Sequence, residues 1–365
     1  MKISIALYPY CAEMLPLVRH FEKMQEKYTI TRLFSLPGLG LGGKDAAYAL
    51  NHPHLGLLVQ DKFEPYDPSW AVLFLTRVPL KIIDNEWLAK ITETTLLAGK
   101  KVVYFDNCEE NVPRELLRLT DLYPDGIVII TEDKQSTEAG SNAGKYGLLK
   151  TAVILVGGLV AANDTYEVLL AMASCLRKQG LRPAVISKHC HIKMLGKEYH
   201  CFNHIMARHG ITEAEKIELL NSYIMDLEQA EIPDIILIEA PDSVMRYNNI
   251  APHGFGIQSH MLCQATAPDY FVCCIPKGLA EGEFLTEISK NLFCRLGSYI
   301  NAVHVSNVVV DSAEVLQTKK VSYVHTNLSE VQEQIAKQRK DSEIPLFDVI
   351  TDGANCLCEA LLIEH

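Results

Sequence analysis

Residues 157–165 have the residue types and the spacing of a phosphate-binding loop. Such a loop follows a strand, reads G-x-x-x-x-G-K-[ST] and opens a helix. Its backbone amides surround phosphates, its lysine neutralises their charge and its hydroxyl holds Mg²⁺. After Gly157, the pattern here runs from Gly158 to Thr165, with Asn163 at the second glycine position and Asp164 at the lysine position. The sequence therefore predicts the geometry of a phosphate loop without its cation.

The aspartate at the lysine position decides which chemistry we expect. Replacing a cation by Asp164 changes the local charge by two units beside a polyanion. Like charges a few ångströms apart repel by roughly 1 to 4 kcal/mol, depending on the effective dielectric. We therefore expect no tight binding of ATP or GTP in the usual mode. A simpler interpretation is that Gly157 and Gly158 only turn a strand into a helix, as in many α/β folds.

Two further acidic residues follow a second apolar strand, which we expect at residues 233–239. Glu239 ends this run, which occupies the place of a Walker-B-like strand, and Asp242 comes three residues later. Open α/β sheets bind ligands at the carboxyl ends of their strands. We therefore expect Glu239, Asp242 and Asp164 to face one crevice, where three acids suit a cation or a basic group better than a phosphate.

Histidine and cysteine residues gather at residues 189–209, which is a candidate metal site. Zn²⁺ takes four N or S ligands in tetrahedral geometry. His200 and His204 have the i, i+4 spacing that pairs two ligands if the segment is helical. The stretch contains no C-x₂-C pair, so the alternative is that these side chains are packed in the protein without a metal.

A glycine-rich stretch at residues 38–43 contains G-x-G-x-x-G after a predicted strand. In dinucleotide-binding folds this motif belongs to the first strand–helix turn and opens a long helix. Here it follows the second predicted strand and precedes only a short segment. We therefore interpret it as a flexible turn and not as a dinucleotide site.

The elements that position these residues alternate between strands and helices. In the first part of the chain, short apolar runs at 3–7, 30–34, 55–59, 71–75, 102–105 and 127–130 are separated by helical patterns such as 13–27 and 86–98. The alternation restarts with strands at 152–156, 183–187, 233–239, 269–275 and 303–310 and with helices at about 165–179 and 212–231. Thr212 and Glu215 are spaced as a capping box.

This order predicts an α/β fold with two Rossmann-like or P-loop-like domains, mostly parallel sheets and a short C-terminal extension. Residues 131–150 collect glycine, serine and asparagine, which is linker composition. We expect a Rossmann-like domain at 1–135, a linker at 136–150, a degenerate P-loop-like domain at 151–330 and a helical extension at 331–365.

The composition excludes several classes of protein. The net charge of −11 argues against binding to nucleic acid or to an anionic membrane surface, because both need clustered lysine and arginine. No run reaches the ~18 apolar residues of a membrane span, and Pro9 interrupts the first apolar run. We expect a cytoplasmic protein whose eleven cysteines are reduced.

Several short motifs together resemble the P-loop-like "peptide maturation system" proteins, which are encoded beside radical SAM maturases and Cys-rich precursor peptides in clostridial natural-product clusters. The resemblance covers about residues 1–325 and rests on scattered motifs. They are Tyr8–Tyr10, Gly42–Asp45, Gly158–Glu167, Val185–Ser187, Lys216–Glu218 with Asn221, Pro233–Ile236, Phe255–Ile257, Gln264–Ala265 with Pro268–Asp269, and Ser306–Asn307. The family's loop carries Asn-Lys-Phe-Glu where this chain has Asp164–Glu167.

The resemblance implies an accessory protein in the maturation of a ribosomally synthesised, post-translationally modified peptide. Its partners would be the precursor peptide and a radical SAM maturase. The alternative is an ATP- or GTP-dependent ligase or hydrolase whose positive charge comes from elsewhere, such as Lys188 or Arg246. A minor alternative is a metal-binding protein. A nucleotide and a metal ion are thus the cofactors to consider, and the sequence predicts neither the reaction nor the oligomeric state.

Overall fold

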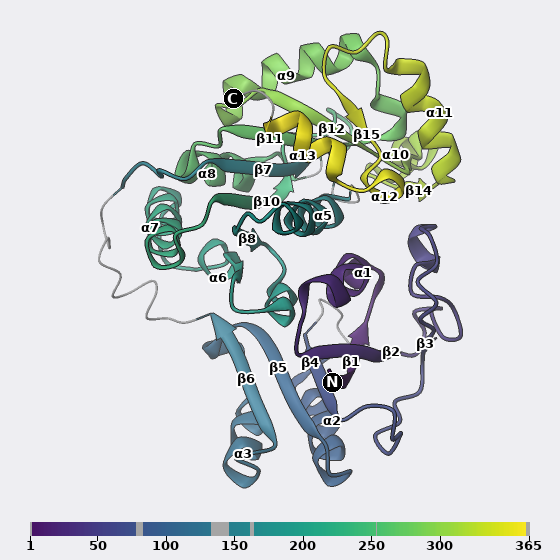
Figure 1. Ribbon diagram of the computed structural model, residues 1–365, viewed down its shortest axis with the longest axis vertical. Coiled ribbons are helices and arrows are strands. Elements are labelled where there is room, and N and C mark those ends of the chain that lie inside the picture. Colours follow the sequence, from purple (N-terminus) through teal and green to yellow (C-terminus); the bar gives the residue numbers. More distant parts are fainter. Residues whose placement is uncertain (1, 78–82, 133–145, 161–163, 253, 363–365) are drawn as a thin grey trace. The chain divides into compact units, whose positions relative to one another are not determined.

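The computed structural model describes residues 2–77, 83–132, 146–160, 164–252 and 254–362. It divides into two compact units (Figure 1). Unit 1 comprises Met1–Lys134 together with His189–His204, and unit 2 comprises Gln135–Lys188 together with Ile205–His365. Both units have parallel sheets and helices, so the predicted fold class of two α/β domains is confirmed.

Unit 1 is built on a parallel sheet with the strand order β3-β2-β1-β4-β5-β6. This is the order of the doubly wound dinucleotide-binding fold. Its strands are β1 (Ile3–Tyr10), β2 (Tyr28–Ser35), β3 (Val59–Gln60), β4 (Val72–Thr76), β5 (Lys101–Cys108) and β6 (Ile127–Glu132), and its helices are α1 (Leu15–Met24), α2 (Asn85–Leu97) and α3 (Arg114–Leu122).

The segment His189–His204 belongs to unit 1, although it follows a strand of unit 2 in the chain. The Lys193 ammonium lies 3.0 Å from a Glu132 carboxylate oxygen at the end of β6, and the same oxygen accepts a hydrogen bond from the Cys201 backbone amide at 2.9 Å. The Gln25 side chain donates to the Met194 carbonyl oxygen at 2.8 Å. The segment includes a 3-10 helix, η4 (Cys190–Leu195), and β9 (Tyr199–Cys201). The sequence pattern alone places these residues in the second domain.

In unit 2 the strands β15, β12, β11, β7, β10 and β8 lie side by side in that order, and the neighbouring strands are parallel. Their bounds are β7 (Val153–Gly158), β8 (Pro183–Ser187), β10 (Ile235–Ser243), β11 (Tyr270–Pro276), β12 (Ile300–Ser306) and β15 (Leu346–Phe347). A small antiparallel pair, β13 (Val308–Val310) and β14 (Tyr323–His325), follows β12.

Helices cover both faces of this sheet (Figure 1). The helices are α5 (Thr165–Lys178), α7 (Glu213–Glu231), α8 (Ile257–Thr266), α9 (Gly282–Leu296), α10 (Ser312–Thr318), α11 (Leu328–Gln338), α12 (Val349–Asp352) and α13 (Asn355–Leu362), and a short α6 (Asn203–Met206) precedes α7. The predicted capping box is present, since Thr212 and Glu215 exchange hydrogen bonds at the start of α7. This capping box satisfies backbone N–H groups in the first turn of α7.

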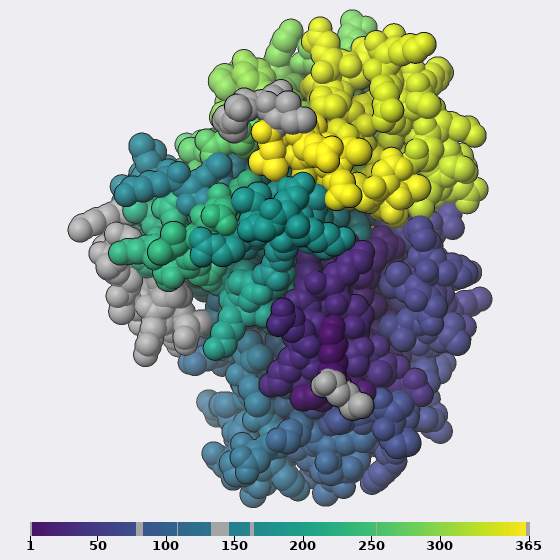
Figure 2. Space-filling model, in the orientation of Figure 1, coloured from purple at the N-terminus to yellow at the C-terminus, as the bar shows by residue number. Residues whose placement is uncertain are grey.

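The C-terminal residues form part of unit 2 and are not purely helical. Strand β15 pairs with β12, and the yellow helices α12 and α13 contact the teal α5 (Figure 2). Helix α5 is accordingly buried along nearly its whole length, from Thr165 to Leu176. The C-terminal segment thus packs against the helix that follows the predicted phosphate loop.

Gly157, the penultimate residue of β7, is required by close packing. A Cβ atom there would lie 2.6 Å from Val244 Cγ1 and 3.2 Å from both Ala240 Cβ and Phe271 Cε2. Protein interiors are packed at crystal-like density, so these neighbours have little space into which to move. The glycine therefore allows β7 to lie between β10 and β11 at the end that carries the loop.

We expect Gly157→Ala to destabilise unit 2 by about 1 to 3 kcal/mol, because overpacking a well-filled core costs energy of this order. The measurement is the urea midpoint of unfolding for the purified variant. Gly278→Ala is the matched control, since nothing lies within 4 Å of the Cβ position at residue 278. Equal midpoints for the two variants would contradict this account of β7.

Candidate functional site

The predicted strand and helix on either side of the loop are both present in unit 2. Strand β7 ends at Gly158, α5 begins at Thr165 and Asp164 is the residue before its first turn. Asn163, the predicted second-glycine position, lies outside the described residues. In parallel sheets ligands bind outside the carboxyl ends of the strands. The ends of β7, β8, β10 and β12 supply the groups described next.

Glu239 on β10 is the centre of this edge of the sheet. Its carboxylate is completely buried and has hydrogen-bond donors from two other segments. Oε1 accepts from the Thr165 hydroxyl at 2.9 Å and lies 3.2 Å from the Lys188 ammonium, while Oε2 accepts from the Ser187 hydroxyl at 2.5 Å. Burying a carboxylate is costly unless it is paired and hydrogen-bonded, and here it is both. The first residue of α5 and the end of β8 are thereby tied to β10.

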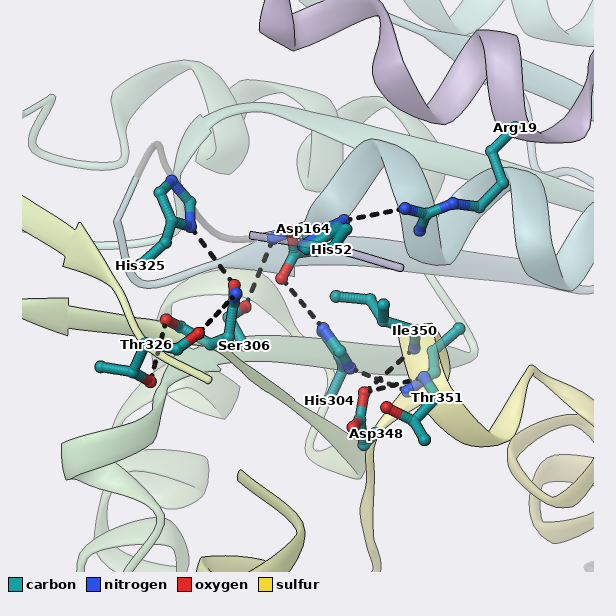
Figure 3. A network of polar contacts seen from close by, with 12 residues as sticks. Arg19, His52, Asp164, His304, Ser306, His325, Thr326, Asp348, Ile350 and Thr351 are labelled. Carbon is teal, nitrogen blue, oxygen red and sulfur yellow. Dashed lines mark hydrogen bonds and ion pairs between the residues drawn. The ribbon is translucent and has the colours of Figure 1, made fainter. Parts of the chain in front are cut away.

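Asp164 is held by β12 (Figure 3). His304 Nε2 lies 3.2 Å from Asp164 Oδ2, and the backbone N–H of Asp164 donates to the Ser306 hydroxyl oxygen at 3.3 Å. The backbone N–H of Val349 donates to His304 Nδ1 at 3.2 Å, so the proton of the neutral imidazole lies on Nε2 and is donated to Asp164. His304 is fully buried and Asp164 is 9% exposed, so this residue at the lysine position is part of the packed structure.

Asp242 has its partners on another element. Its Oδ1 atom accepts from the backbone N–H of Ser259 at 3.1 Å and from the Ser259 hydroxyl at 2.6 Å, which ties the end of β10 to α8. The three predicted acids therefore have separate partners: Glu239 with Thr165 and β8, Asp164 with β12, and Asp242 with α8. Each acid is already engaged within the protein.

Cys274 shows that Asp164 and Glu239 still share one electrostatic environment. Burial raises the pKa of this thiol well above its usual value, and the Asp164 and Glu239 carboxylates raise it further, whereas Lys188 lowers it. Cys274 pairs with Gly158 in neighbouring strands, so it lies beneath the start of the loop. A thiol with a raised pKa stays protonated at neutral pH and is a poor nucleophile. It therefore acts as a buried apolar neighbour.

Sequence reasoning missed some of these residues. His304 lies in the predicted strand at 303–310 but was given no role at the site, and Ser306 and Ser187 were named only as part of resemblance motifs. Polar side chains in otherwise apolar strands are the signal that marks them, because such groups are buried only with partners. Arg246, the other proposed source of positive charge, is exposed in the segment after β10.

The condition for pairing His200 with His204, a helix that carries both residues, is not met. His200 lies on strand β9, whereas His204 lies on the short helix α6, where its Nδ1 atom is 3.1 Å from the Cys201 carbonyl oxygen. Within the described ranges of the chain, no group of three or more His, Cys, Asp and Glu side chains could hold a metal ion. A zinc site in this stretch thus loses the geometric support that the i, i+4 spacing gave it.

The glycine-rich stretch at 38–43 forms turns after β2. Gly38, Gly40 and Gly43 all have positive φ angles, which glycine adopts without strain. The only regular structure between this stretch and β3 is the 3-10 helix Tyr48–Leu50. The stretch does not open a long helix, which a dinucleotide-binding turn requires.

The fold is similar to that of a solved protein. The crystal structure of a DUF1611 family protein from Anabaena variabilis superposes with a TM-score of 0.61 at 13% sequence identity, and the match covers 99% of this chain and 100% of that one. At this identity the likeness concerns the fold alone. No family model matches the sequence, and no curated protein matches it significantly. Among the residues that the structure describes, no helix combines the length and apolar character that a membrane crossing requires.

We expect Asp164→Ala to destabilise the protein by about 1 to 3 kcal/mol, because His304 Nε2–H then lacks this buried acceptor. Asp164→Asn keeps an acceptor oxygen and should cost less. The Asp164 side chain makes no capping hydrogen bond to α5, so a lost cap does not contribute to the difference. Urea unfolding of both variants tests this, and equal losses would show that the hydrogen bond from His304 does not account for the destabilisation.

Proposed function

We propose that this protein is an accessory protein in the maturation of a ribosomally synthesised, post-translationally modified peptide. In this role it binds the precursor peptide or an enzyme that modifies it, such as a radical SAM maturase, and it acts in the cytoplasm. The sequence motifs at the loop, at β8 and at β10 support the peptide-maturation context. One observation favours an accessory role over conventional nucleotide hydrolysis. It is the contact of Asp164 with His304.

Asp164 matters because a phosphate loop works through the cation at this position. Here the position holds an acid whose carboxylate is a hydrogen-bond acceptor within unit 2, so it contributes structure where a lysine would contribute charge. The whole chain has a net charge of −11, which favours basic or neutral partners. A precursor peptide with basic residues, or a basic surface of a maturase, fits this charge.

Binding to the neighbouring gene products tests the proposal. Calorimetric titration of the full chain with the precursor peptide, and separately with the maturase, should give a dissociation constant at or below about 10 µM for one of them. A peptide of the same composition in scrambled order is the control for non-specific charge attraction. If neither partner binds more tightly than the scrambled peptide, the accessory role is wrong.

A second candidate function is an ATP- or GTP-dependent ligase or hydrolase with an atypical phosphate loop. It is favoured by the contact between Thr165 and Glu239, because in P-loop enzymes the loop hydroxyl and an acid on the neighbouring strand hold Mg²⁺. Both are oxygen donors, which Mg²⁺ prefers. The Lys188 ammonium, 3.2 Å from Glu239, supplies a positive charge at the same edge of the sheet.

In that function each residue has a defined task. The ion, when bound, would supply positive charge that offsets the charge of the phosphates. Thr165 and Glu239 would hold it, the backbone amides at the start of α5 would orient the phosphates, and Lys188 would take the role of the missing lysine from a different strand. Releasing Lys188 from Glu239 is then part of ligand binding.

Thermal unfolding with Mg²⁺ and nucleotide tests this candidate. Ligand at a hundred times its dissociation constant stabilises a protein by about 2.7 kcal/mol, which raises the Tm by several degrees. Lys188→Gln should abolish most of the rise, whereas the control Lys178→Gln, exposed at the far end of α5, should retain it. No Tm change with ATP or GTP, or equal changes in both variants, would contradict nucleotide binding.

A further inference from the structure

Unit 2 contains a pocket of about 350 Å³ that begins beside the loop after β7. Leu159, the first residue after β7, forms part of its wall. Met245 to Asn248, which follow β10, form a second part, and Leu279 with residues of α9 from Phe284 to Asn291 forms the third. Because two parts of the wall are segments that follow the carboxyl ends of β7 and β10, the pocket occupies the general position of ligand sites in α/β folds.

The wall after β10 is shaped by its own hydrogen bonds. The Asn248 side-chain oxygen accepts from the backbone N–H groups of Ile250 and Ala251 at 2.8 and 2.7 Å. The backbone N–H of Tyr247 donates to the Pro252 carbonyl oxygen at 2.9 Å. A segment held in this way presents Arg246 and Tyr247 from a defined turn, and a preformed site loses less conformational entropy when a ligand binds.

Two opposite charges line this pocket. Arg246 and Glu287 are both exposed, and within the described part of the chain neither side chain takes part in an ion pair or a side-chain hydrogen bond. Around them the lining is mainly apolar, with Leu159, Phe284 and Ile288 among its members. The pocket thus offers one cation, one anion and an apolar wall.

We propose that this pocket binds a zwitterionic α-amino acid with an apolar or aromatic side chain. Its carboxylate would pair with the Arg246 guanidinium, its ammonium group with the Glu287 carboxylate, and its side chain would contact the apolar wall. The volume lies at the lower end of the roughly 300 to 1,000 Å³ of small-molecule pockets, which suits one amino acid better than a larger ligand. This goes beyond the proposed function, because it requires neither a peptide partner nor a nucleotide.

Titration with three related compounds tests the charge pairing. Phenylalanine carries both charges, N-acetylphenylalanine only the carboxylate and phenylalaninamide only the ammonium group. Calorimetry on the full chain, without nucleotide or partner protein, should give a dissociation constant of about 1 mM or tighter for phenylalanine. Each singly charged compound should bind about fivefold more weakly, the effect of losing one exposed ion pair.

Two variants assign each charge to its residue. Arg246→Gln should weaken phenylalanine about fivefold and leave phenylalaninamide unchanged, because that compound has no carboxylate to lose. Glu287→Gln should weaken phenylalanine similarly and leave N-acetylphenylalanine unchanged. Arg295→Gln and Glu283→Gln, on α9 but outside the pocket lining, are the controls and should bind phenylalanine like the unmodified protein.

Three results would overturn the proposal. They are the absence of phenylalanine and leucine binding up to about 10 mM, equal binding of the three compounds, and equal effects of the pocket and control variants. Because the titration contains neither a peptide partner nor a nucleotide, its failure leaves the accessory and nucleotide-dependent functions to be judged by their own experiments.

Discussion

The buried carboxylate of Glu239 is the constraint on which the edge of unit 2 depends. One acid, with no exposed surface, receives hydrogen bonds from Thr165 and Ser187 and an ion pair from Lys188. These groups begin α5 and end β8, so Glu239 ties the start of α5 and the end of β8 to β10. An unpaired buried carboxylate would be too costly to keep ionised, and its partners are therefore as necessary as the acid itself.

The charge balance of this edge differs from the one that its residue types imply. Counting acids along the sequence gives an electronegative crevice, whereas in the structure Lys188 offsets Glu239, and Asp164 and Asp242 accept hydrogen bonds from His304 and Ser259. Formal charge in a motif is thus a poor guide to local potential when the groups are buried and paired.

Local patterns predicted much of the fold but little of the site's bonding. The apolar runs correctly predicted β1, β2, β4, β7 and β10, because the strands of a buried parallel sheet are continuously apolar. The spacing of Thr212 and Glu215 correctly predicted the start of α7. The contact of Asp164 with His304 could not be predicted, because it joins residues 140 positions apart and depends on the strand order. The pairing of His200 with His204 could not be decided for a related reason: a four-residue spacing brings two side chains together only where the backbone between them is helical, and His200 lies on β9.

The insertion of His189–His204 into unit 1 has a consequence for how this chain is made and dissected. A ribosome that has released only the first 134 residues has released an incomplete unit, since Glu132 still lacks Lys193 and the Cys201 amide. Unit 1 can reach its final form only after the first strands of unit 2 have been synthesised. Cutting the gene at the glycine- and serine-rich stretch would therefore separate unit 1 from its own segment His189–His204, which would remain on the fragment that carries unit 2.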